Sequence, residues 1–123
     1  MQFDDKVPIY YQIENYLYHQ IVAGTLQPGA KLPAVRQLAV DLTVNVNTVQ
    51  RALTEMIRQE ILESRRGRGN FVTQDTARIT ALKHRLITDY IQELYIQLHA
   101  LQMDDAEIVA AVQRYLQTRG NQA

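Results

Sequence analysis

The chain contains no cysteine, only three prolines and five glycines, and no net charge, because 13 acidic residues balance 13 basic ones. Without cysteine it has neither a disulfide framework nor a thiolate metal site, which fits a reducing compartment. Sparse glycine and proline, together with a hydrophobic content of 46%, argue against wholesale disorder. We therefore expect a packed globular protein.

A long hydrophobic run is also missing. No stretch approaches the roughly 18 apolar residues of a membrane span, and the acidic start does not resemble a signal peptide. We expect a cytoplasmic protein without a membrane partner. A chain of 123 residues is long enough for a compact domain with an appendage, but too short to include a large effector or catalytic module.

Charge is distributed unevenly along the chain. Residues 1–30 carry one basic and three acidic residues, residues 31–76 carry seven basic and five acidic ones, and the remainder is balanced. For nucleic-acid binding, the distribution of charge matters more than its sum. The basic excess of the middle region is modest, so we expect salt to weaken any such binding readily.

Three helical patterns precede the middle of the chain. From Pro8 to Gly24 apolar residues recur every four positions, and the glycine supplies a C-terminal stop. Pro33 is placed to open a second helix, because its missing N–H is no loss in a first turn. Asn45 is a good N-cap for a third helix with an apolar inward side. Two helices joined by so short a turn form a helix-turn-helix, which suits reading a DNA groove.

Two β-like runs follow at residues 61–64 and 70–73, on either side of the sequence RRGRG. Glycines on both sides of Arg68 let the backbone turn sharply and approach a phosphate or a groove floor, while the arginine supplies charge. This pattern predicts the wing of a winged helix-turn-helix. The predicted fold is mainly α with a small β wing.

The last part of the chain is predicted to be helical. A pattern over residues 76–101 carries a wide apolar stripe, and the spacing of Asp104 and Glu107 resembles a capping box that starts a further helix. Two helices cannot bury so much apolar surface alone, so we expect a DNA-binding domain over residues 1–75 and a two-helix dimerisation element over residues 76–123. The predicted dimerisation residues are Leu82, Leu86, Tyr90, Leu94 and Leu98.

Residues from about 7 to 73 resemble the DNA-binding domain of the GntR family of bacterial transcription regulators. The motifs that carry the resemblance are PIYYQI at 8–13, IVAGTLQPGAKLP at 21–33, RQLA at 36–39, VN and NTV at 44–49, AL at 52–53, and GRGNFV at 67–72. Several motifs in the correct order make the resemblance highly specific. The short helical C-terminal region resembles the YtrA-type subfamily, whose C-terminal helices dimerise the protein.

The resemblance implies a sequence-specific, homodimeric DNA-binding transcription repressor that acts on a pseudo-palindromic operator in double-stranded DNA. We expect no cofactor. From the residues alone, the alternative is a winged-helix module whose third helix docks on a protein. No nucleophile–base pair, metal set or phosphate loop supports an enzyme. A small-molecule effector could act by shifting the spacing of the two reading helices, although no residue set specifies one.

Candidate DNA-binding residues come from the second helix, the third helix and the wing. The resemblance implies a DNA contact for the arginine at the start of the second helix. On the third helix, Asn or Gln would read adenine and Arg would read guanine. The full set is Arg36, Asn45, Asn47, Thr48, Gln50, Arg51, Arg66, Arg68 and Gly69. Asn45 serves equally well as a cap alone, Thr48 suits phosphate better than a base, and Arg65 is a weaker candidate.

Four positions depart from the family pattern. Ala34 stands where Ser is common, which predicts a weaker cap for the second helix, with Gln37 partly offsetting the loss. Val46 and Gln50 stand where many members have Arg, so the base preference of Arg-rich members does not carry over. Thr43 stands where Gly is frequent, so a left-handed turn there would be strained.

The histidines and tyrosines are alternative candidates for a functional site. The three histidines lie in separate helical patterns without metal-ligand spacing, so we expect surface or packing roles and no metal. Five tyrosines fall on helix stripes, where packing in the core or a dimer is favoured over stacking on bases. They are Tyr10, Tyr16, Tyr90, Tyr95 and Tyr115.

Overall fold

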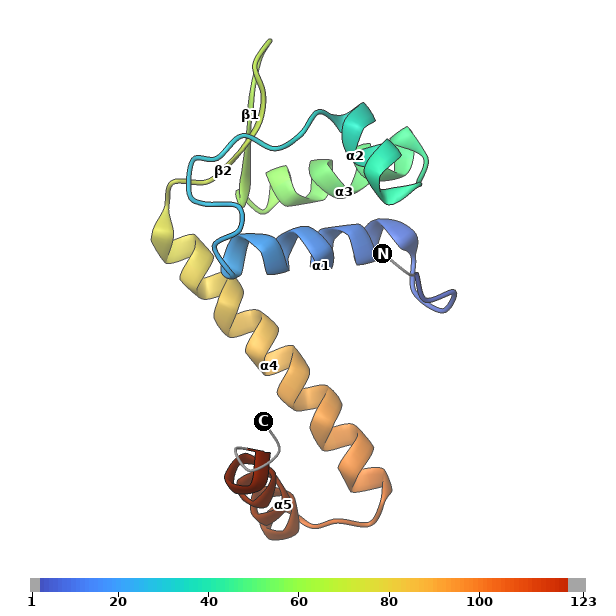
Figure 1. The fold of residues 1–123 in the computed structure, drawn as a ribbon, viewed down its shortest axis with the longest axis vertical. Coiled ribbons are helices and arrows are strands. Elements are labelled where there is room, and N and C mark those ends of the chain that lie inside the picture. Colours follow the sequence, from blue (N-terminus) through green and yellow to red (C-terminus); the bar gives the residue numbers. More distant parts are fainter. Residues whose placement is uncertain (1–2, 120–123) are drawn as a thin grey trace. The chain divides into compact units, whose positions relative to one another are not determined.

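The computed structural model describes residues 3–119, which form five helices and one two-stranded antiparallel sheet (Figure 1). The chain divides into two compact units, the first ending at Lys83 and the second beginning at His84. This content of secondary structure confirms the predicted mainly-α fold with a small β wing.

Helix α1 (Ile9–Val22) follows the pattern predicted for it. Pro8 occupies the N-cap position with φ −54°, close to the angle that its ring imposes. Gly24 lies just past the C-terminal end with φ 85°, a left-handed conformation that glycine adopts without strain. The helix packs against α3 (Val46–Arg58), and its Ile13 side chain is completely buried.

The start of α2 (Val35–Leu42) differs from the prediction that Pro33 opens the helix. Ala34 occupies the N-cap position, and no side chain bonds to the first turn. The backbone N–H of Leu32 donates to the carbonyl of Asn70 at 2.9 Å, so the chain before Pro33 runs alongside the wing. Pairing with the wing therefore keeps this segment extended, and the helix begins only after it.

The turn between α2 and α3 passes through a left-handed residue. Thr43 has φ 57° and ψ 51°, and the next N–H, that of Val44, donates to the carbonyl of Ala39 at 2.9 Å. This confirms the left-handed conformation expected where the family often has glycine, and a β-branched residue is strained there. A left-handed residue also follows α3, where Glu60, one position past the C-cap Gln59, has φ 63°.

The wing is a hairpin of β1 (Leu62–Arg65) and β2 (Gly69–Val72), with Arg65 opposite Gly69. Each strand lies one residue from its predicted position. The N–H of Arg68 donates to the carbonyl of Arg65 at 2.9 Å, and this hydrogen bond closes the tight turn between the two strands. Gly67 and Gly69 have φ 75° and 109°, so the turn needs glycine at both positions.

The core of the first unit draws on α1, α3 and the base of the wing. Apolar side chains from these elements reach complete burial, which removes them from water and fixes the elements to one another. The largest fully buried side chains are Ile13, Leu17, Val49, Leu53, Met56, Leu62 and Val72. This core holds α3 so that its opposite side is exposed.

Two helices make up the end of the described chain. Helix α4 (Thr76–Ala100) crosses from the first unit into the second, and α5 (Asp105–Thr118) contains no buried residue. The capping box predicted before α5 is confirmed: Asp104 accepts from the N–H of Glu107 at 2.8 Å, and the Glu107 carboxylate accepts from the N–H of Asp104 at 3.1 Å. None of the described helices combines the length and the hydropathy needed to cross a membrane.

Candidate nucleic-acid interface

The N-terminal end of α3 is held by a side-chain cap. The Oδ1 atom of Asn45 accepts a hydrogen bond from the backbone N–H of Asn47 at 2.7 Å, as expected of an Asn at this position. The cap fixes the first turn of α3, where the Asn47 side chain is exposed and Thr48 is half-buried. The capping role of Asn45 is thereby confirmed, and its exposed amide N–H groups can still donate elsewhere.

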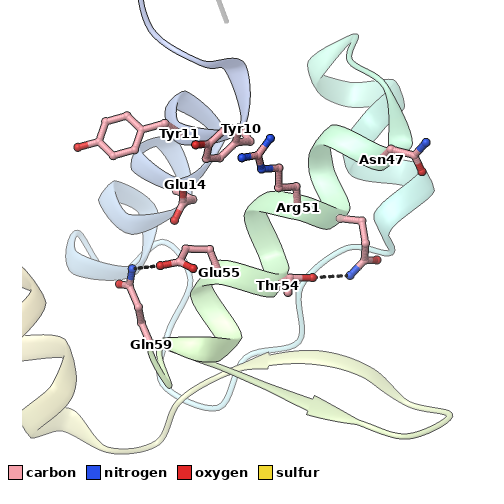
Figure 2. A pocket seen from close by; sticks show the side chains of 9 residues that line it. Tyr10, Tyr11, Glu14, Asn47, Arg51, Thr54, Glu55 and Gln59 are labelled. Carbon is pink, nitrogen blue, oxygen red and sulfur yellow. Dashed lines mark hydrogen bonds between the residues drawn. The ribbon is translucent and has the colours of Figure 1, made fainter.

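Three of the predicted residues of α3 gather at one groove between α1 and α3 (Figure 2). The groove has a volume of about 730 Å³ and is lined by Asn47, Gln50 and Arg51 together with residues of α1. The amide of Gln50 donates to the hydroxyl of Thr54 at 3.3 Å, which steadies it along the helix. Amide and guanidinium groups side by side can read adenine and guanine edges in a major groove.

A tyrosine of α1 completes this groove. The Cζ atom of Arg51 lies 3.8 Å from the centre of the Tyr10 ring, within the range of a cation–π contact. Figure 2 shows the two side chains pointing toward each other from α1 and α3. The helical spacing of α1 assigns Tyr10 to packing, and nothing in the sequence pattern points to its contact with Arg51.

A second group of candidate DNA-contacting residues lies around the turn between α2 and α3. Arg36 is exposed in the first turn of α2 and lines a surface hollow together with Val40, Val44 and Val46. Val40 is 72% exposed and Val46 is 42% exposed, so both present apolar surface to solvent beside the start of α3. Such a surface can contact the methyl group of thymine. Gln37 donates to Asp41 at 2.7 Å, so the expected help with capping α2 is not observed.

The tip of the wing presents cations. Arg66 and Arg68 are exposed, and within the described residues neither takes part in an ion pair. Arg65 differs, because its Cζ atom lies 4.2 Å from the centre of the Phe71 ring and its guanidinium is 3.6 Å from the Glu63 carboxylate. The tip arginines are therefore available to phosphates, whereas Arg65 is held against the hairpin.

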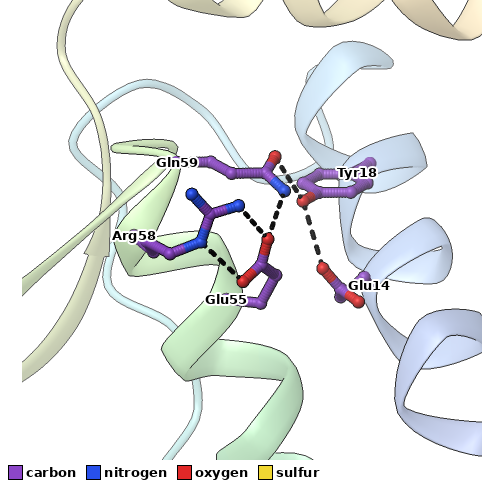
Figure 3. A network of polar contacts seen from close by, with 5 residues as sticks. All are labelled: Glu14, Tyr18, Glu55, Arg58 and Gln59. Carbon is purple, nitrogen blue, oxygen red and sulfur yellow. Dashed lines mark hydrogen bonds and ion pairs between the residues drawn. The ribbon is translucent and has the colours of Figure 1, made fainter.

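A polar network fixes α1 to the C-terminal end of α3 (Figure 3). The hydroxyl of Tyr18 donates to Gln59 at 2.9 Å, and the amide of Gln59 donates to the Glu55 carboxylate at 2.9 Å. Arg58 donates to the same carboxylate at 2.8 Å through Nε. The hydrogen bond from Arg58, with that from Gln59, lowers the pKa of Glu55 to about 2. The sequence pattern did not predict this network.

Glu14 adds a buried carboxylate to the network. Its side chain is only 4% exposed, and its oxygen lies 3.4 Å from the Tyr18 hydroxyl. In the described part of the chain, no cluster of histidine, cysteine, aspartate or glutamate could hold a metal ion.

Residues 9–72 match the sequence profile of the bacterial regulatory proteins of the gntR family. The chain belongs to the GntR family. It is 37% identical to the transcriptional repressor YtrA of Bacillus subtilis, over 80% of this chain and 78% of YtrA. These similarities confirm the resemblance to the GntR family and its YtrA-type subfamily.

Solved structures extend the comparison to the fold. A GntR family transcriptional regulator from Listeria monocytogenes superimposes with a TM-score of 0.84 at 38% identity, covering 91% of this chain and 98% of that one. The DNA-binding domain of AraR in complex with its operator ORE1 has a TM-score of 0.54 at 26% identity, covering 58% of this chain and 90% of that one. The GntR fold of this chain thus has counterparts both along nearly its full length and in a DNA complex.

The predicted dimerisation residues of this GntR chain differ in exposure. Leu82 and Leu86 are buried and Leu98 is half-buried, whereas Tyr90 and Leu94 are 45% and 40% exposed. Other large apolar side chains are exposed on α4 and on α5. They are Ile87, Ile91, Tyr95 and Ile96 of α4 and Val109, Val112, Tyr115 and Leu116 of α5.

Proposed function

We propose that the chain is a cytoplasmic, sequence-specific DNA-binding transcription regulator that represses its target genes as a homodimer. The observation that carries this proposal is that Asn47, Gln50 and Arg51 are exposed together at the start of α3. The wing adds two exposed arginines at its tip, Arg66 and Arg68. Recognition helix and wing are the two elements by which this fold contacts a duplex. The relatives are transcription regulators, and one is a repressor.

Each part of the face has a proposed role. Asn47 and Gln50 hydrogen-bond to base edges in the major groove, and Arg36 binds a phosphate at its rim. Arg66 and Arg68 contact phosphates or the minor groove, and Gly69 lets the wing backbone approach closely. Phosphate contacts supply much of the affinity, whereas the contacts of α3 decide the sequence.

Dimerisation is proposed to use the exposed apolar side chains of α4 and α5. Soluble monomers rarely leave so many large apolar side chains exposed on two consecutive helices. A two-fold dimer would present two copies of α3 to a pseudo-palindromic operator, one per half-site. An effector molecule would act by changing the spacing of these two helices.

A footprinting experiment on the DNA that flanks the gene tests the proposal. The expected result is a protected two-fold site that disappears as salt is raised and that is lost in the variant Asn47→Ala with Gln50→Ala. A reporter gene placed behind the same site should be expressed at a lower level when the protein is present. If no site is protected even at low salt, the DNA-binding function is contradicted, and a winged helix that docks on protein becomes the better interpretation.

A further inference from the structure

Arg51 is held by an aromatic ring and by no charged partner. Its Cζ atom lies 3.8 Å from the centre of the Tyr10 ring, and within residues 3–119 it has no ion pair or side-chain hydrogen bond. The carboxylate one turn further along α3, that of Glu55, is occupied by Arg58 and Gln59. Arg51 is thus not paired with the nearest acid of its own helix.

Stacking leaves the hydrogen-bonding edge of a guanidinium free. The N–H donors of arginine point outward in the plane of the group, whereas a ring contacts only its face. An ion pair would consume the same donors that a base requires. Tyr10 therefore orients Arg51 without occupying any of its donors.

The position of the ring is itself rigid. Tyr10 is half-buried on the first turn of α1, one turn before the fully buried Ile13. Helix α1 is packed against α3, and the network from Tyr18 to Gln59 ties the two helices together at the other end. A ring fixed in this way limits the rotamers of the arginine that stacks on it.

We propose that Tyr10 is a positioning residue that holds Arg51 ready to form two hydrogen bonds with a guanine. This inference rests on the proposed DNA-binding function. It adds the base that Arg51 reads and the residue of α1 that positions Arg51. Guanine offers O6 and N7 as a pair of acceptors that matches the planar fork of arginine. An arginine already restrained loses less rotamer freedom on binding, so recognition of that guanine is stronger.

The test measures affinity for the best operator and for copies in which each guanine is replaced by 7-deazaguanine, which lacks only the N7 acceptor. For the wild type, one guanine per half-site should show a loss of about tenfold on this replacement. The loss should vanish in Arg51→Ala. In Tyr10→Leu the affinity loss caused by 7-deazaguanine should shrink by about threefold to tenfold, which corresponds to the free energy of one cation–π contact. Tyr10→Phe, which keeps the ring, should behave as the wild type.

The matched control is Tyr16→Leu, the same substitution at an exposed position of α1. It should leave the 7-deazaguanine penalty unchanged. The double variant Tyr10→Leu with Arg51→Ala should discriminate between guanine and 7-deazaguanine no less than Arg51→Ala alone, because the ring acts only through the arginine. Arg51→Lys, which leaves α1 intact, should reduce the penalty while keeping affinity for random duplex, because an ammonium can donate to N7 but lacks the planar fork that binds O6 and N7 together.

Several results would overturn the inference. One is an unchanged penalty in Tyr10→Leu or in Arg51→Lys. Another is a Tyr10→Leu variant that loses affinity equally for the operator, its 7-deazaguanine copies and random duplex, which would indicate a structural role only. Failure of the proposed function is distinct, because the wild type itself would then bind no duplex preferentially.

Discussion

The Asn45 side chain accepts a hydrogen bond from the backbone N–H of Asn47 at 2.7 Å, so one polar side chain closes the turn and starts the recognition helix. The cap and the candidate base contacts are therefore adjacent along the backbone. Anything that loosens the first turn of α3 should disturb both stability and binding.

Replacement of Asn45 by Ala should lower the free energy of unfolding by about 1 kcal/mol, because an N–H of the first turn loses its partner. Urea unfolding monitored by helical circular dichroism measures the change. Asn45→Ser keeps a capping oxygen and should retain most of the stability. If Asn45→Ser is stable but loses affinity for the operator, Asn45 contacts a base as well as the backbone. Equal stability of Asn45→Ala and the wild type would contradict the capping role.

The pH dependence of stability should include a contribution from Glu55. Its pKa is lowered from 4.5 to about 2 by hydrogen bonds from Arg58 and Gln59. A carboxylate with a lowered folded-state pKa stabilises the fold above its unfolded pKa, and this contribution is lost as the pH falls toward the folded value. The stability difference between the wild type and Glu55→Gln should therefore be constant near neutrality and shrink between about pH 4.5 and pH 2.

Urea midpoints across that range provide the measurement. The control is Glu107→Gln, which removes a carboxylate of the second unit and leaves the Glu55 contacts in place. If the wild type and Glu55→Gln show parallel profiles down to pH 2, the ion pair with Arg58 contributes nothing to the fold in solution. High salt should reduce the difference, because both partners are partly exposed.

Removal of an arginine from the wing tip should weaken binding to every duplex by a similar factor. Arg68→Ala is expected to lower the slope of log affinity against log salt concentration by about 0.9, the value for one phosphate contact. Arg114→Ala removes the same charge from α5 and should leave the slope unchanged. A salt titration by fluorescence anisotropy distinguishes the two. A loss confined to one sequence would assign Arg68 to base reading instead.

A charge placed on the exposed stripe of α4 should separate the dimer. Leu94→Glu is expected to sediment as a monomer at micromolar concentration, because an apolar contact would have to bury a carboxylate. Gln92→Glu adds the same charge at a position nearly opposite on the helix and should remain dimeric. The monomeric variant should also lose most of its operator affinity, because it binds one half-site at a time. A wild type that sediments as a monomer would remove the basis of this prediction.

Local patterns predicted the elements of the fold well. The four-residue repeat of α1, the capping residue Asn45 and the Asp104 box are properties of neighbouring residues, and the structure confirms each of them. Pro33 shows the limit of this reasoning. Its ring suits a helix start, but pairing of the preceding residues with β2 decides the outcome, and that pairing joins segments far apart in the sequence.

The same limit applies to the candidate site. Exposed polar residues on α3 follow from periodicity, as do the arginines between two short strands. The contact between Tyr10 and Arg51 and the bond between Tyr18 and Gln59 depend on how α1 crosses α3, which no spacing within either helix encodes. Leu82 and Leu86 are likewise buried within the single chain, although the apolar stripe of α4 predicted both of them at a dimer contact. The stripe alone does not show which of its residues are buried within the chain.

The left-handed residues Thr43, Glu60 and Gln102 follow three successive helices, and none of them is a glycine. Each carries strain that glycine would avoid, on the order of 1 kcal/mol. The natural sequence is therefore less stable than its own backbone allows. Gln102→Gly, in the loop before α5, should raise the free energy of unfolding. In that variant, destabilising substitutions in the recognition helix can be studied in a protein that still folds.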